Sequence, residues 1–115
     1  MLVETRSVDP LATHLYRYGS RRTLFVTGEL DVATAPALES AVDGALDGQG
    51  GELCLDFSGL TFIDSTGVRA VMQVHNKVAS FGSRLVILSP TAPVHRVLQI
   101  MGLDRVMDVR DDARR

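Results

Sequence analysis

The sequence predicts an α/β fold: one domain spanning residues 1–115, with a mixed sheet of four or five strands and flanking helices. Short runs rich in aromatic and β-branched residues alternate with longer segments of helical periodicity, the pattern of parallel strands joined by crossovers. The first two runs follow each other directly, so an antiparallel hairpin makes the sheet mixed. The chain has 115 residues and is 45% hydrophobic, which suits a single core.

Residues 14–18 and 23–27 are the predicted strands of the hairpin, and residues 19–22 form a short polar connection that contains a glycine. A helix then begins near Pro36, because proline suits the first helical turn. Apolar residues continue at helical spacing and place one stripe against the core: Leu38, Ala41, Val42, Ala45 and Leu46. The glycines of residues 48–51 end this helix.

Residues 52–57 are a short apolar run, as expected for a strand buried on both faces. Residues 58–63 are predicted to be a loop that leads into a second helix. Apolar residues recur at helical spacing from Val68 to Ala79, and Gly82 follows as a stop signal.

Residues 84–88 form another strand of the buried type, and residues 94–101 carry the pattern of a third helix. Residues 105–109 are a candidate edge strand. The charged tail at 111–115 is expected to fray. The predicted element order is therefore β-β-α-β-α-β-α, with a possible final strand.

Charge and composition exclude several classes of function. Twelve Lys and Arg residues against fourteen Asp and Glu residues give a net charge of −2, and adjacent basic pairs occur only at 21–22 and 114–115. A nucleic-acid or anionic-membrane partner would need a basic stripe, so neither is expected. No apolar stretch is long enough to span a bilayer, and Met1–Pro10 lacks a signal-peptide core, so we expect a soluble cytoplasmic protein.

The residues that bind metals and cofactors are not grouped in this chain. The single cysteine, Cys54, lies in an apolar run and is expected to be a core residue. The three histidines are far apart and show no ligand spacing. We therefore expect no cofactor and no metal.

The segment Asp64-Ser65-Thr66-Gly67 lies where a helix is predicted to begin. Backbone N–H groups at a helix N-terminus are unpaired, and the helix dipole adds partial positive charge there. A phosphate on Ser65 would find donors at this position, and it would bring roughly −1.5 to −2 charges. Repulsion between the Asp64 carboxylate and this phosphate would then change how a partner protein binds.

A purely structural interpretation of the same segment is that Ser65 or Asp64 is an N-cap, a role worth about 1 kcal/mol. A reciprocal capping box would need Glu or Gln at position 68, where the sequence has Val68. The sequence by itself leaves both interpretations open.

The run from Leu55 to Val68 resembles the signature of STAS domains. More specifically, it is similar to bacterial anti-sigma-factor antagonists, in which the serine of an Asp-Ser-(Ser/Thr)-Gly motif is phosphorylated. A second match is Val26-Thr27-Gly28-Glu29-Leu30-Asp31 followed by Ala35-Pro36-Ala37-Leu38, which resembles the family's Gly-x-(Leu/Ile)-Asp segment. The resemblance implies a single STAS-like domain with a core at about 14–109 and flexible ends.

This resemblance implies a partner switch. In such proteins the unmodified form binds an anti-sigma factor of the serine-kinase fold and frees the sigma factor, which regulates transcription. The kinase uses ATP to phosphorylate the serine and end binding, and a phosphatase resets the switch. The protein would be the substrate of a kinase, not an enzyme, and is expected to be a monomer or weak dimer.

The site residues follow by position from the resemblance. Ser65 would be the phosphoacceptor, although Thr66 offers a second hydroxyl. Asp64, Thr66 and Gly67 would shape its loop, and Asp31 would help form the partner-binding surface.

Three other functions stay open at the level of sequence. A STAS domain can be a companion subunit of a transport system, docking without phosphorylation, although transport copies need not keep the serine. A stress-signalling scaffold would usually bring a sensory domain. A hydrolase with Ser65 as nucleophile lacks the Gly-x-Ser-x-Gly elbow and a placed histidine base. Three large apolar residues near the motif, Leu60, Phe62 and Ile63, are expected to plug the core or to form a docking patch.

Overall fold

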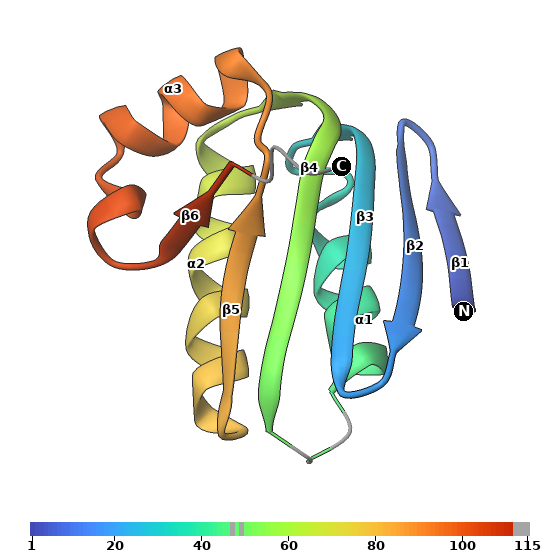
Figure 1. Cartoon of the computed structure of the whole chain (residues 1–115). Coiled ribbons are helices and arrows are strands. Elements are labelled where there is room, and N and C mark those ends of the chain that lie inside the picture. Colours follow the sequence, from blue (N-terminus) through green and yellow to red (C-terminus); the bar gives the residue numbers. More distant parts are fainter. Residues whose placement is uncertain (47, 49, 112–115) are drawn as a thin grey trace.

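The computed structural model describes residues 1–46, 48 and 50–111. Its elements, in order, are β1 (Leu2–Val8), β2 (Leu11–Tyr18), β3 (Arg21–Leu30), α1 (Ala35–Ala45), β4 (Gly51–Ile63), α2 (Ser65–Ser80), β5 (Ser83–Leu88), α3 (Ala92–Ile100), the 3-10 turn η1 (Leu103–Arg105) and β6 (Asp108–Arg110). The strands form one six-stranded sheet in chain order, β1 to β6 (Figure 1). β1, β2 and β3 are antiparallel, whereas β3 to β6 are parallel. The predicted α/β fold with a mixed sheet is confirmed, with six strands rather than four or five.

β1 is the additional strand, in a segment for which the sequence predicts no element. It pairs along its length with β2, from Leu2 opposite Tyr16 to Val8 opposite Leu11. The segment lacks the alternation of apolar and polar residues that predicts a half-buried strand, and none of its residues is fully buried. Backbone pairing with a neighbour, rather than a buried side-chain face, holds β1 in the sheet.

β4 is also longer than predicted, because residues 58–63 continue the strand instead of forming a loop. They pair with the end of β3, where Thr27 lies opposite Gly59 and Leu30 lies opposite Ile63. Two register shifts interrupt this pairing. Ser58 and Gly59 are typical of turns, so local sequence hides a strand that its neighbour stabilises.

The hairpin connection also differs from its prediction. Arg21 and Arg22 belong to β3 and not to the turn. At the other end of the chain, the last strand was predicted over residues 105–109, but Arg105 ends η1 and β6 begins at Asp108. Of the predicted tail, residues 112–115 lie outside the described part of the chain.

The helices α1 and α2 cover one face of the sheet, and α3 lies at the end of it (Figure 1). α1 packs on β1, β2 and β3, while α2 packs on β4 and β5 and against α1. Alternate strand residues, including Leu15, Leu24 and Val26, enter one buried cluster with the helices. The opposite face of the hairpin strands is more open. Among the described residues, no helix combines the length and apolar composition that crossing a bilayer requires.

Candidate functional site

The first turn of α2 begins directly at the end of β4, and Asp64 is its N-cap. Asp64 has extended backbone angles, and its Oδ1 accepts a hydrogen bond of 2.8 Å from Gly67 N. Its carbonyl oxygen accepts from Val68 N at 2.9 Å, which starts the helical ladder. The structure therefore assigns the capping role to Asp64 and not to Ser65.

Ser65 occupies the first helical position and is exposed, while Thr66 beside it is half-buried. The two hydroxyls of the motif thus differ in accessibility. A group attached to the Ser65 oxygen would lie at the N-terminus of a 16-residue helix, where N–H groups and the helix dipole favour negative charge.

Gly67 explains the close packing beneath this turn. A Cβ atom added there would lie 2.6 Å from the carbonyl oxygen of Leu30 and 2.8 Å from Cγ1 of Ile63. Any side chain would therefore push the start of α2 away from the ends of β3 and β4. Glycine at this position lets the helix terminus lie directly against the sheet.

Asp31 shapes the loop between β3 and α1. Its Oδ1 accepts hydrogen bonds from Ala33 N at 3.0 Å and from Thr34 N at 3.2 Å. The buried Thr34 hydroxyl donates to the Glu29 carbonyl oxygen at 2.9 Å, and it accepts from Asp31 N at 2.9 Å. The Asp31 carboxylate is thus engaged in its own loop, and its contribution is to hold that loop in one shape.

The two sequence motifs meet at the carboxyl ends of β3 and β4. Leu30 lies opposite Ile63 in the parallel ladder, and Asp64 N donates to the Leu30 carbonyl oxygen at 3.3 Å. The structure therefore brings Asp31, which follows Leu30, to the same edge as Asp64, Ser65, Thr66 and Gly67. Loops at this edge of parallel strands commonly carry binding function.

Two exposed apolar side chains lie on these same segments. Val32, next to Asp31, is 71% exposed, and Phe62, next to Ile63, is 46% exposed. Leu60 and Ile63 are buried, so the three apolar residues that precede the motif divide between core and surface. We call Val32, Phe62 and Ser65 the strand-end surface. Sequence reasoning missed Val32, whose only local signal is an apolar residue between Asp31 and the helix start.

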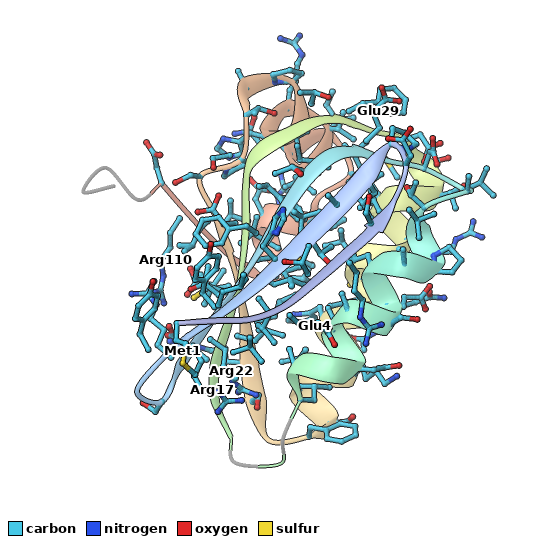
Figure 2. The ribbon with its side chains drawn as sticks, turned by 90° about the vertical axis from the view of Figure 1, so that its right-hand side faces the viewer. Met1, Glu4, Arg17, Arg22, Glu29 and Arg110 are labelled. Carbon is cyan, nitrogen blue, oxygen red and sulfur yellow. The ribbon has the colours of Figure 1, made fainter. Side chains whose placement is uncertain are left out.

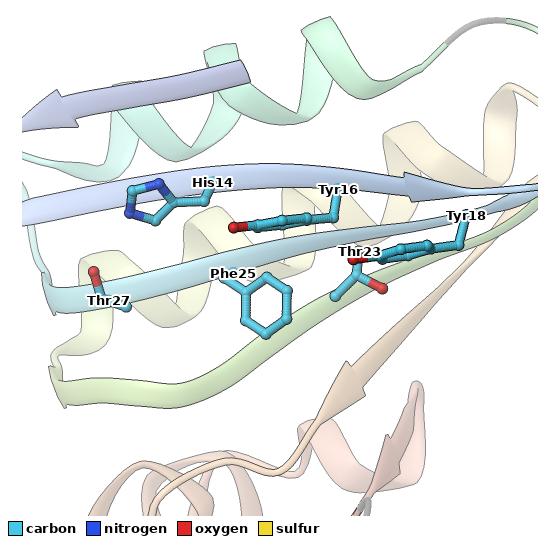
Figure 3. Close-up of a pocket in the computed structure, with 6 residues that line it drawn as sticks. All are labelled: His14, Tyr16, Tyr18, Thr23, Phe25 and Thr27. Carbon is cyan, nitrogen blue, oxygen red and sulfur yellow. The ribbon is translucent and has the colours of Figure 1, made fainter. Parts of the chain in front are cut away.

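A hollow of about 540 Å³ lies elsewhere, on the open face of β2 and β3 (Figure 3). Aromatic and polar residues line it: His14, Tyr16, Tyr18, Thr23, Phe25 and Thr27. The Tyr16 and Phe25 rings meet edge to face with centroids 5.4 Å apart. Because α2 covers the other face of the sheet, this hollow and the first turn of α2 are separate features.

Two marked pKa shifts of acidic groups also lie outside the strand-end surface. The hydrogen bond from Arg84 lowers the pKa of Glu52, and burial raises the pKa of the Cys54 thiol. Cys54 is fully buried, as predicted. Within the described ranges, no group of three or more His, Cys, Asp or Glu side chains is arranged to hold a metal ion.

Comparison with known proteins gives a family match over most of the chain. The family described as "Mlab, STAS domain" matches residues 14–109. The anti-sigma-B factor antagonist of Listeria monocytogenes is 26% identical over 88 residues, which cover 76% of this chain and 77% of that protein. The anti-sigma-F factor antagonist RsfB of Mycobacterium tuberculosis is 27% identical over 97 residues, covering 84% of this chain and 79% of the relative.

Solved structures share the fold. An anti-sigma factor antagonist from Mycobacterium paratuberculosis superposes with a TM-score of 0.78 at 24% identity, covering 90% of this chain and 88% of the other. The antagonist SpoIIAA in its unphosphorylated form gives a TM-score of 0.71 at 24% identity, covering 88% of each chain. The murine Solute Carrier 26 family member A9 anion transporter gives 0.70 at 19% identity, covering 78% of this chain but 15% of the transporter.

Proposed function

The chain belongs to the STAS domain family, and from this premise we propose that it is a phosphorylation-switched anti-sigma-factor antagonist. In its unmodified form it binds an anti-sigma factor of the serine-kinase type and releases the sigma factor. Phosphorylation of Ser65 by that kinase ends binding, and a phosphatase restores it. Residues 1–115 act as one cytoplasmic domain whose role is binding and not catalysis.

The observation that carries this proposal is the division of roles between Asp64 and Ser65. Asp64 caps α2, so the exposed Ser65 hydroxyl is not needed to hold the helix and is accessible to a kinase. A phosphate attached there would be stabilised by the backbone N–H groups and the dipole of the helix N-terminus. The curated relatives named as antagonists are consistent with this role.

The strand-end surface supplies the partner contact in this proposal. Val32, in the loop after β3, and Phe62, near the end of β4, offer exposed apolar area. Asp31 and Gly67 act indirectly, because one fixes the β3–α1 loop and the other lets α2 lie close to the sheet. Such a surface, with an apolar part beside a hydroxyl, suits a protein partner.

The switch then works by exclusion. A phosphate adds roughly −1.5 to −2 charges to a surface that already carries the Asp64 carboxylate. Burying this group against a partner costs desolvation and like-charge repulsion. A penalty of about 3 kcal/mol corresponds to roughly a hundredfold loss of affinity.

The proposal is tested by intact-mass spectrometry after incubation with a candidate anti-sigma kinase and ATP. We expect one added phosphate on the wild type and on Thr66→Ala, and none on Ser65→Ala. Partner binding, measured by calorimetry, should survive Ser65→Ala and weaken strongly in the phosphorylated protein. Phosphate on Thr66 alone, or undiminished binding of the phosphorylated form, would contradict the assignment.

The second candidate is a companion subunit of a transport system that docks without phosphorylation. The fold that this chain shares with part of the anion transporter is the observation that raises this candidate. The variant Ser65→Asp distinguishes the two: a phosphorylation switch should lose partner binding, whereas a permanent subunit should keep it.

A further inference from the structure

β1 is an edge strand with one unpaired side. It pairs with β2, and no strand lies beyond it in the sheet of the described chain. Figure 2, viewed from the side on which β1 lies, shows the strand crossing the front of the molecule. Alternate residues of this seven-residue strand therefore point their backbone N–H and C=O groups away from β2, which is a template for pairing with another strand.

The charges of β1 alternate in a way that fits a second copy of the same strand. Arg6 Nε lies 2.7 Å from Glu4 Oε1, and both side chains lie beside Gly44 of α1, on the helix-covered face. Thr5 between them lies on the opposite face, where its hydroxyl is 3.1 Å from His14 Nδ1. An antiparallel copy centred on Thr5 would place Glu4 of each strand opposite Arg6 of the other.

This register is distinguished from its neighbours by electrostatics. Centring the pair on Glu4 would put two carboxylates opposite each other, and centring it on Arg6 would put two guanidinium groups together. Like charges directly opposite are unfavourable in a sheet, whereas unlike charges stabilise it. Only the register centred on Thr5 turns the Glu4–Arg6 pair of each protomer into a square of four alternating charges.

Exposed apolar side chains flank these charges. Val3 and Val8 are 47% and 48% exposed. The pairing with β2 is irregular between Leu2 and Glu4, so the regular part of β1 runs from Glu4 to Val8. In the register centred on Thr5, Val8 of each strand lies opposite Leu2 of the other, which is 49% exposed.

We propose that β1 mediates a two-fold symmetric homodimer, in which two β1 strands pair antiparallel about Thr5 and the two sheets become continuous. Edge charges can instead protect a strand from pairing. In β1, however, Glu4 of each copy would face Arg6 of the other, so these charges do not repel a second chain. A single strand pair is a small contact, so the dimer is weak and concentration-dependent. The strand-end surface lies on the β3–α1 loop, the end of β4 and the first residue of α2, and none of these residues belongs to β1, so this dimer does not depend on the proposed phosphorylation.

The test uses sedimentation equilibrium of the full chain from about 10 µM to about 1 mM, a range that detects weak association. We expect the wild type to move from monomer toward dimer. Glu4→Arg and Arg6→Glu should each stay monomeric, because like charges then face each other. The double variant Glu4→Arg/Arg6→Glu should dimerise again, and Arg96→Glu on α3 serves as a charge-matched control that should behave as wild type.

Mixing the two single variants gives the sharpest result. Glu4→Arg presents two arginines and Arg6→Glu presents two glutamates, so a mixture should form a heterodimer that neither protein forms alone. Circular dichroism checks that each variant is folded. A wild type that stays monomeric at about 1 mM, a dimer that tolerates both single reversals, or a mixture that stays monomeric would overturn the proposal.

Discussion

At the scale of single residues, Asp64 and Ser65 divide two roles that the sequence leaves combined. The cap is visible as the 2.8 Å contact between Asp64 Oδ1 and Gly67 N. Ser65 is exposed one position later and contributes no cap. This separation lets the serine change its chemistry without removing the interaction that begins α2.

The first prediction follows from this division. Asp64→Ala should lower the free energy of unfolding by about 1 kcal/mol, because an N-cap is lost. Ser65→Ala should change it by less than about 0.5 kcal/mol, since an exposed hydroxyl outside the cap is removed. Urea denaturation of both variants measures the difference. A larger cost for Ser65→Ala than for Asp64→Ala would show that the serine holds the helix terminus.

At the scale of elements, the approach of α2 to the sheet depends on one glycine. Gly67 faces the Leu30 carbonyl oxygen and Ile63, and both belong to the rigid ends of strands. Gly44 in α1 offers a useful contrast. The nearest atoms to a Cβ added there are the ends of the Arg6 and Glu4 side chains, at 3.3 Å, and these can move.

The second prediction compares alanine at these two glycines. Gly67→Ala should destabilise the protein by about 1–3 kcal/mol, because a methyl group is forced into packed backbone. Gly44→Ala should be neutral or stabilising by up to about 1 kcal/mol, since alanine is the better helix former at an exposed position. Thermal unfolding of both variants gives the comparison. Equal effects would mean that helix propensity, and not the packing of α2, decides the outcome at Gly67.

At the scale of the whole molecule, Arg22 joins segments that are distant in sequence. It is 1% exposed, and its guanidinium donates to the Ala45 carbonyl oxygen and to the Gly50 carbonyl oxygen, each at 2.7 Å. A longer contact of 3.4 Å reaches Ser83 Oγ. One buried side chain thus links β3, the end of α1, the residue before β4 and the start of β5.

The third prediction concerns this link. Arg22→Met should lower the free energy of unfolding by about 2–3 kcal/mol, because buried carbonyl groups lose charged donors. Arg96→Met, at an exposed position of α3, should change it by less than about 0.5 kcal/mol. Urea denaturation of both variants checks the difference, and an Arg22→Met protein as stable as wild type would refute the structural role.

Local patterns predicted much of the fold and the candidate site. The three helices, the antiparallel hairpin and the parallel strands were predicted from apolar spacing and strand-forming residues. The start of α2 at the Asp64–Gly67 motif was also readable, because capping depends on residues three positions apart. The roles of Ser65, Asp31 and their neighbours in partner binding stay predictions.

By itself, therefore, the sequence determined the α/β class, the order of its main elements and the segment where a switch would lie, since these depend on short-range periodicity and capping. Only the tertiary structure decided that residues 2–8 and 58–63 are strands, that Arg22 is buried, and that Val32 and Phe62 are exposed. The physical reason is that strand pairing and burial depend on neighbours distant in the chain: β2 stabilises β1, the end of β3 extends β4, and helix packing decides which apolar side chains lie outside the core.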